Sequence, residues 1–233
     1  MKSPQTWARI VGALYMYVIG ASVFALVSTQ SLIVRNDAAA TAANILASEQ
    51  LFRLAFVANL LACAAYVAVV AILYQLMKPA GRTLSVVAGF MGLTGCAVSG
   101  ATMLNQLAVL AFLDNATYLA AFSSEQLQAL SRVSLRLGGL GNTIALVFFG
   151  FYCLLLSGLV FRAKFLPRFL GVLPMIAGIG WLTGTMASLL MPSLGIAGVL
   201  IPISGIGEGL FTLWLLVMGV NAAKWREQAG ADV

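Results

Sequence analysis

Six long apolar runs constrain this chain more than any other feature of its sequence. A helix needs about 20 apolar residues to cross roughly 30 Å of hydrocarbon, and each run is close to that length or longer. They lie at residues 10–28, 54–77, 84–113, 137–161, 169–191 and 199–220. The third is long enough to tilt or to project beyond the bilayer. The sequence therefore predicts an all-α fold, a polytopic bundle of six transmembrane helices in a single transmembrane domain of residues 1–233.

Composition favours a membrane protein over a soluble one. Of the 233 residues, 61% are apolar and 9% are charged, and the mean hydropathy is +1.00, whereas an ordinary soluble domain has about 25% charged residues. The net charge of +6 comes from Lys and Arg in short gaps between the runs, without the dense basic cluster typical of nucleic-acid binding. We therefore expect the lipid bilayer as a partner and no nucleic acid.

The first run has an alternative interpretation. Lys2 and Arg9 precede it and small residues follow it, which is also the pattern of a cleaved signal peptide. Its removal would leave five spans whose basic ends no longer alternate, so a retained span is the better prediction.

The distribution of Lys and Arg predicts the orientation, because basic residues collect on the cytoplasmic side. Four cations, Arg35, Arg53, Arg132 and Arg136, share their side with several acids. Nine cations fall on the other side: Lys2, Arg9, Lys78, Arg82, Arg162, Lys164, Arg168, Lys224 and Arg226. Both termini are therefore predicted to be cytoplasmic, with segments 29–53, 114–136 and 192–198 facing outward.

The two longer outer segments resemble each other. Asp37 leads through AAATAANILASEQL into the second span, and Asp114 leads through NATYLAAFSSEQL into the fourth. Each of these spans ends in a basic turn that contains proline. The pattern predicts a parallel two-helix repeat, in which spans two and three correspond to spans four and five. The alternative is convergence on good helix starts and inside turns.

Both outer segments carry signals for helix starts. Asp37 and Asp114 are suitable N-cap residues, and Ser123 with Gln126 fits a capping box. We expect a short helix at the outer surface before each span. It would act as an amphipathic lid or, as the simpler interpretation, form a structured loop.

Glu208 is the acidic residue that stands inside a predicted span. An unpaired acid at the centre of a membrane helix costs about 2.5 kcal/mol or more, so it should be neutral, paired or next to a cavity. Ser204 and Thr212 lie four residues on either side of it, which makes one helix face polar. Pro202 and the glycines nearby could delay the helix start and bring Glu208 nearer the outer surface.

Three arginines are candidate counter-ions for Glu208. Arg53, Arg132 and Arg136 lie at the outer ends of spans two and four, and we predict a contact between Glu208 and either Arg136 or Arg53. Such a pair has three interpretations: an ion pair that only fixes helix packing, a ligand or ion site, or a catalytic group. The sequence leaves all three open.

Other polar residues in the spans are weaker candidates. Asn59 in the second span and Gln106 in the third could line a cavity, although hydrogen bonding between helices explains them equally well. The chain has no histidine, which removes the commonest general base and the commonest ligand of zinc, copper and haem. We find no nucleophile–base motif, Walker sequence or dinucleotide fingerprint. No catalytic residue, metal or cofactor is therefore predicted.

Three segments also resemble a known family. They are SLIVRNDAAATAANILASEQLFRL, LVFFGFYCLLLSGLVFRAKFLPRFLGVLPMIAGIGWL and GEGLFTLWLLVMGVN, which are similar to the domain-of-unknown-function 4386 family over about residues 8–222. The resemblance implies a prokaryotic protein of the cytoplasmic membrane with about six spans and no agreed activity. Arg53 and Glu208 match charged positions of the family pattern. Where many members have histidines, this chain has Gly138 and Tyr152, and Arg136 replaces an acid.

The preferred hypothesis is an outward-facing cavity, bounded by Arg53, Arg136 and Glu208, that binds a small amphiphile, lipid or ion for transport or sensing. The first alternative is a structural or partner-binding membrane protein whose charges lock the helices together. The second is a histidine-free intramembrane enzyme, which the missing histidine makes the weakest of the three. A homo-oligomer is compatible with the small-residue pairs Gly180/Gly184 and Gly205/Gly209.

Overall fold

The computed structural model describes residues 3–114 and 116–231, and within them it contains helices and no strand. Lys2, which contributes to the predicted orientation, lies outside the described residues. The α-helices are α1 (Pro4–Leu32), α2 (Ala38–Ala47), α3 (Glu49–Met77), α4 (Arg82–Thr102), α5 (Leu104–Leu113), α6 (Ser124–Arg162), α7 (Val172–Leu190), α8 (Ala197–Val217) and α9 (Ala222–Ala231). Short 3-10 turns are η1 (Lys78–Ala80), η2 (Thr117–Leu119), η3 (Arg168–Gly171) and η4 (Pro192–Leu194).

Six helical stretches of the described chain are long and apolar enough to cross a membrane, as predicted. They are Pro4–Leu32, Glu49–Ala80, Arg82–Leu113, Ser124–Arg162, Arg168–Leu190 and Ala197–Val217. Most are longer than the apolar runs because polar residues extend them at their ends. The long third stretch is divided into α4 and α5 by one residue, Met103, whose backbone angles are still helical.

Helix ends follow the local sequence signals in two of the three predicted places. The Asp37 Oδ1 accepts a hydrogen bond from the Ala40 amide at 2.8 Å, which caps α2. Ser123 and Gln126 form the reciprocal capping box, with bonds of 2.8 and 3.3 Å, and α6 consequently starts well before residue 137. The prediction for Asp114 is wrong: it lies at the C-terminal end of α5, and the next turn starts after Ala116 without a side-chain cap.

The described chain forms two compact units, and several long helices contribute to both. Unit 1 consists of Met1–Tyr17, Ala64–Cys96 and Ile144–Val233. Unit 2 consists of Val18–Cys63 and Ala97–Thr143. That both belong to one transmembrane domain stays a prediction.

Unit 2 contains α2, the short outer helix predicted before the second span. Its residues Thr41 and Ile45 are fully buried, and Ile45 packs in an apolar cluster with Leu32, Phe52 and Val109. The Thr41 hydroxyl also donates to the Asp37 carbonyl at 2.7 Å. Because one face of α2 is packed in this way, it fits the structured-loop interpretation.

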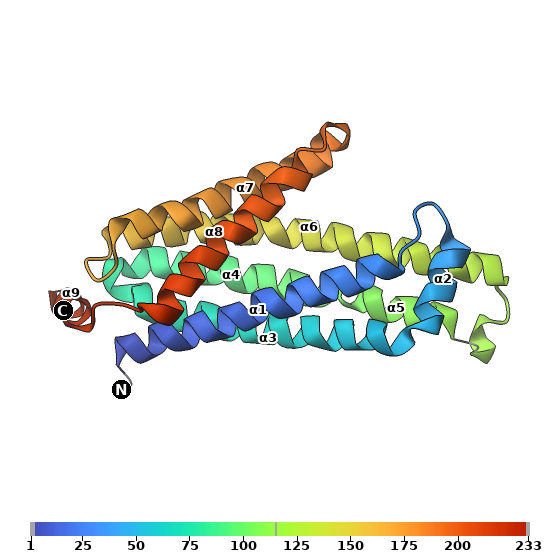
Figure 1. Cartoon of the computed structure of the whole chain (residues 1–233), viewed down its shortest axis with the longest axis horizontal. Coiled ribbons are helices and arrows are strands. Elements are labelled where there is room, and N and C mark those ends of the chain that lie inside the picture. The colour runs from blue at the N-terminus through green and yellow to red at the C-terminus, as the bar shows by residue number, and fades with distance from the viewer. Residues whose placement is uncertain (1–2, 115, 232–233) are drawn as a thin grey trace. The chain divides into compact units, whose positions relative to one another are not determined.

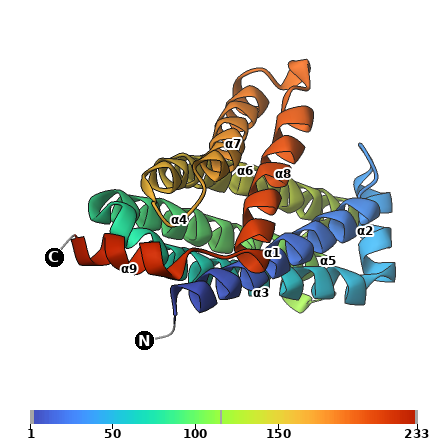
Figure 2. The ribbon, with the colours of Figure 1, turned by 60° about the vertical axis from the view of Figure 1, so that its left-hand side comes forward.

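Unit 1 contains the hairpin of α7 and α8, which run side by side (Figures 1 and 2). Glycines permit close packing here and against α6. A Cβ on Gly207 would lie 2.8 Å from the Leu173 carbonyl oxygen, and a Cβ on Gly178 would lie 2.8 Å from that of Gly150. Side chains at these points would force the helices apart.

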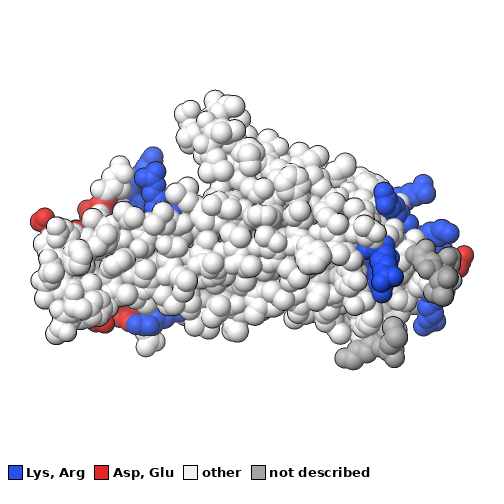
Figure 3. Space-filling model, turned by 180° about the vertical axis from the view of Figure 1, so that it is seen from behind, with Lys and Arg blue, Asp and Glu red and all other residues white. Residues whose placement is uncertain are grey.

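One end of unit 1 brings both ends of the chain together. Gln5 at the start of α1 donates to the Met218 carbonyl at 3.0 Å and accepts from the Val220 amide at 2.8 Å. The rings of Trp7 and Trp225 meet edge to face at 6.4 Å. Figure 3 shows Lys and Arg gathered at this end. The two ends of the chain therefore lie on the same side of the bundle; that this side is cytoplasmic stays a prediction, as does the two-helix repeat.

Candidate functional site

Glu208 lies near the middle of the 21-residue helix α8 and is half-buried. Pro202 is inside this helix, which runs without interruption from Ala197 to Val217. The expectation that Pro202 delays the helix start is therefore wrong. Proline is tolerated within membrane helices because the groups it frees find other partners. Glu208 is consequently held at the depth of the membrane by regular helix on both sides.

Two neighbouring helices donate hydrogen bonds to the same oxygen of Glu208. The Cys153 thiol on α6 donates to Oε1 at 2.9 Å, and the Trp181 indole N–H on α7 donates to Oε1 at 3.1 Å. Neither bond uses the second oxygen, Oε2. The carboxyl group thus joins three helices of unit 1 and keeps one oxygen outside these two bonds.

A group of tyrosines lies beside this carboxyl group. Tyr15 on α1 is near enough to interact with it, and the Tyr15 hydroxyl is hydrogen bonded to that of Tyr66 on α3 at 2.9 Å. The Tyr66 ring also meets the rings of Phe149 and Tyr152 edge to face, at 5.0 and 6.4 Å between centroids. These side chains form one group of aromatic rings and hydroxyls, and Tyr15 is its member beside Glu208.

The polar face predicted for α8 turns inward. Ser204 and Thr212 are both fully buried. The Ser204 hydroxyl bonds back to the Leu200 carbonyl at 2.9 Å, and the Thr212 hydroxyl has no partner among the described residues. Both residues therefore share a face with Glu208, but the Ser204 bond goes to the backbone and not to the carboxyl group.

The three predicted counter-ions belong to unit 2, whereas Glu208 belongs to unit 1. Arg53 binds Glu49 one turn earlier on α3, at 2.6 Å between Nε and Oε1, and its side chain is 59% exposed. Arg132 is half-buried and Arg136 is exposed. A contact between Glu208 and Arg136 or Arg53 stays a prediction, and the carboxyl partners found within unit 1 are the neutral donors described above.

Asn59 and Gln106, the remaining candidates, also belong to unit 2. Both are half-buried. The Gln106 Nε2 is buried and has no hydrogen-bond partner among the described residues. That they line a cavity stays a prediction.

Sequence reasoning did not identify the donors to Glu208. Neither Cys153 nor Trp181 was among the candidate site residues predicted from the sequence. One signal was available for Trp181: it and Glu208 are nearly equally distant from the 192–198 turn, so an antiparallel hairpin brings them to one depth. For Cys153 no comparable signal exists, because α6 is not the chain neighbour of α8.

The chemistry of this arrangement is that of a carboxyl group with neutral donors. Among the described residues no three acidic, cysteine or histidine side chains gather closely enough to hold a metal ion. The thiol of Cys153 and the carboxyl group of Glu208 are within hydrogen-bond distance, and Cys153 is only 1% exposed.

The comparisons with known proteins identify a family. No curated protein and no solved structure matches the chain significantly. A family described as "Domain of unknown function (DUF4386)" matches residues 10–219, a region that includes Glu208, most of the first span and the whole of the other five described spans. This protein is therefore a multi-pass membrane protein that belongs to the DUF4386 family.

Proposed function

We propose that the protein binds a small amphiphile, lipid or ion beside Glu208, and that this binding serves transport or sensing. The supporting observation is a carboxyl group at membrane depth whose partners are the neutral side chains of Cys153, Trp181 and Tyr15, with no salt bridge to a described Lys or Arg. Such a group is costly unless a further partner or a proton compensates it.

The surface of α8 beside Glu208 is open on one flank. Gly205 and Gly209 lie about 60° and about 100° around the helix axis from Glu208, in the same direction. A Cβ on either glycine would meet no atom within 4 Å. A ligand can therefore reach the carboxyl group over a helix surface that has no side chains.

The neighbouring chemistry favours a cationic head group with an apolar tail. The rings of Trp181 and Tyr15 lie close to the carboxyl group, and aromatic faces attract organic cations. Beyond the two glycines, Ile206 and Leu213 are 62% and 46% exposed and offer an apolar surface to a tail. An amphiphilic amine or quaternary ammonium compound fits both features.

Ligand-induced thermal stabilisation in detergent tests this proposal. The probes are a decyltrimethylammonium salt, sodium and calcium ions, and decanoate as the anionic counterpart. We expect the cationic amphiphile to raise the melting temperature of the wild-type protein in a concentration-dependent way. Glu208→Gln should abolish the shift because it removes the negative charge and keeps the shape of the side chain.

A matched pair of glycine variants tests the route to the carboxyl group. Gly209→Leu covers the open flank, whereas Gly198→Leu on the same helix adds the same side chain at a position that also has no atom within 4 Å. We expect the ligand response to disappear in Gly209→Leu and to persist in Gly198→Leu. An equal response in the wild type, Glu208→Gln and Gly209→Leu would refute binding at this site.

A structural role is the second candidate, and one observation favours it. The Cys153 thiol on α6 and the Trp181 indole on α7 donate to the same carboxyl oxygen of Glu208 on α8. Such an arrangement fixes the packing of three helices. On this hypothesis Glu208→Leu lowers the melting temperature, while none of the four probes stabilises the wild-type protein.

A further inference from the structure

Three segments that carry basic residues meet at one end of unit 1. The Trp225 indole N–H on α9 donates to the Leu76 carbonyl in the last turn of α3 at 2.8 Å. Gln228, also on α9, donates to the Arg162 carbonyl at 3.2 Å and accepts from the Lys164 amide at 2.8 Å. Helix α9 therefore contacts the end of α3 and the end of α6, at the end of unit 1 where Figure 3 shows Lys and Arg.

Positive charge exceeds negative charge in these segments and in the turn that leads into α4. The acid among their described residues is Glu227, which is exposed. The cations in the same stretches are Lys78, Arg82, Arg162, Lys164, Lys224 and Arg226. None of these cations forms a salt bridge with a described acid. The surface therefore attracts anions, and its own carboxylates do not neutralise it.

Two of the arginines come together at Gly81, between η1 and α4. A Cβ on Gly81 would lie 3.7 Å from Nη1 of Arg162, so this guanidinium group lies against the turn. Arg82 is the next residue of the chain, and its Cα is about 3.8 Å from the Cα of Gly81. Both arginines are exposed. An anion that binds at Gly81 is therefore next to the Arg162 guanidinium and within the length of the Arg82 side chain.

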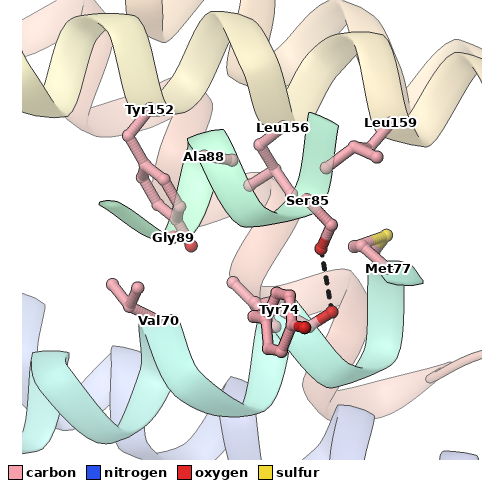
Figure 4. Close-up of a pocket in the computed structure, with 10 residues that line it drawn as sticks. Val70, Tyr74, Met77, Ser85, Ala88, Gly89, Tyr152, Leu156 and Leu159 are labelled. Carbon is pink, nitrogen blue, oxygen red and sulfur yellow. Dashed lines mark hydrogen bonds between the residues drawn. The ribbon is translucent and has the colours of Figure 1, made fainter. Parts of the chain in front are cut away.

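The helices on both sides hold this turn in place. The Gly81 amide donates to the Lys78 carbonyl at 3.2 Å. Ser85 in the first turn of α4 is buried, and its hydroxyl donates to the Tyr74 carbonyl of α3 at 2.9 Å, as Figure 4 shows. Leu159 of α6 lines the same small cavity as Ser85, and its Cδ2 would lie 3.6 Å from a Cβ on Gly81. The backbone that carries the arginines is thus preorganised, which lowers the entropic cost of binding.

Tryptophans place this turn at the level of the lipid head groups. Trp225 bonds to the carbonyl of Leu76, two residues before η1, and its ring meets that of Trp7 edge to face. Tryptophan is enriched where a membrane meets water. The arginines beside Gly81 therefore face the charged layer of the bilayer.

The exposed face of α4 continues from Arg82 into apolar residues. They are 39%, 67% and 42% exposed, and they are Val87, Phe90 and Leu93. A soluble anion such as free phosphate would make no use of this apolar surface. A molecule that has an anionic head and apolar chains would contact both the arginines and the helix face.

We propose that the turn at Gly81 binds the phosphate group of an anionic phospholipid between Arg82 and Arg162, with the acyl chains along the exposed face of α4. Guanidinium groups bind phosphate oxygens in a bidentate geometry, and basic pockets between membrane helices bind anionic head groups. The inference goes beyond the proposed function, because it concerns α4 and α6 at the basic end of unit 1 and does not involve Glu208.

Native mass spectrometry of the protein in detergent tests this site. The probes are dioleoylphosphatidylglycerol, which is anionic, and dioleoylphosphatidylcholine, which has the same chains and no net charge. We expect the wild-type protein to bind the anionic lipid at least tenfold more tightly. Arg82→Gln and Arg162→Gln should each weaken this binding by about fivefold, the effect of one basic residue near a charged membrane. Arg162→Lys keeps the charge and should lose less.

Arg9→Gln is the matched control, because Arg9 is an exposed cation of unit 1 on α1 and its substitution removes the same charge. We expect less than a twofold change in binding. A loss in Arg9→Gln as large as that in Arg82→Gln and Arg162→Gln would mean attraction to the net charge alone and overturn the site. Equal affinity of the wild-type protein for the two lipids would overturn it as well.

Competition with soluble anions distinguishes a lipid from a free phosphate. Inorganic phosphate and glycerol 1-phosphate carry the anionic group without acyl chains. We expect neither to displace the anionic lipid at millimolar concentration. Displacement by either one would assign the turn to a soluble anion and contradict the proposal.

Glu208→Gln separates this site from the one in the proposed function. We expect this variant to bind dioleoylphosphatidylglycerol with the affinity of the wild-type protein, whether or not the cationic amphiphile binds beside Glu208. If Glu208→Gln loses the anionic lipid while Arg82→Gln and Arg162→Gln retain it, the lipid binds at the carboxyl group and the site at Gly81 is refuted.

Discussion

At the scale of single residues, Cys153 has the clearest contribution that can be measured. Its thiol is one of two donors to Oε1 of Glu208, and it is buried in unit 1. Hydrogen bonds between membrane helices contribute about 0.6 kcal/mol on average and up to about 1.7 kcal/mol. The bond is therefore expected to contribute to stability without dominating it.

We expect Cys153→Ala to lower the free energy of unfolding by about 0.5–2 kcal/mol, because it removes one donor to a carboxyl group that water does not fully solvate. Cys153→Ser keeps a donor of similar size and should retain most of the stability. Denaturant unfolding in mixed micelles measures both changes. If alanine and serine have the same effect, the hydrogen bond to Glu208 does not contribute to stability.

At the scale of elements, close contact between α1 and α8 depends on the absence of a side chain. A Cβ on Gly12 would lie 2.5 Å from the Leu216 amide nitrogen and 2.6 Å from its Cα. These are backbone atoms of a helix, so they cannot move aside as the end of a side chain can. Helix α1 would have to shift away from α8.

We therefore expect Gly12→Ala to be destabilising by about 1–3 kcal/mol, the usual cost of overpacking, in spite of the better helix propensity of alanine. Gly20→Ala in the same helix has free space around the new methyl group and should leave the melting temperature unchanged or raise it. Thermal unfolding followed by circular dichroism compares the two. Equal melting temperatures would mean that α1 does not pack against α8 at Gly12.

The helices also show which parts of the fold could be predicted from the sequence alone. Counting apolar residues located all the spans, because length and hydropathy are local properties of the chain. The same count placed the start of α6 too late. The helix begins at Ser124 after a polar capping box, and a count of apolar residues does not detect such a box. Glu208 was recognisable as an acid within a span, whereas its bond to Cys153 depends on how α6 and α8 are rotated toward each other, and no local pattern records that rotation.

At the scale of the whole molecule, the even number of spans and the contact between the two chain ends agree: both put the ends on the same side of the membrane. The Gln5 and Trp7 contacts put the start of α1 beside the α8–α9 connection, as six crossings require. The Lys and Arg distribution then predicts that both ends are cytoplasmic.

Fusion reporters in a bacterial host measure this orientation. We expect a green fluorescent protein fused after Val233 to fluoresce, and alkaline phosphatase inserted at Gly195 between α7 and α8 to be active. Phosphatase inserted at Lys164, between α6 and α7, should be inactive. An active phosphatase fusion at the C-terminus would contradict the predicted orientation.

The bonds from Gln5 to Met218 and Val220 span 213 and 215 residues of sequence, which has a consequence for biosynthesis. At a synthesis rate of about 5–20 residues per second, the first helix waits roughly 10–40 s before its partner leaves the ribosome. During that interval Gln5 and Gly12 lack the surface against which they finally pack, and lipid or an insertion factor must cover them. A chain that stops before α8 retains this uncovered face, which gives cellular quality control a means to tell an incomplete product from a finished one.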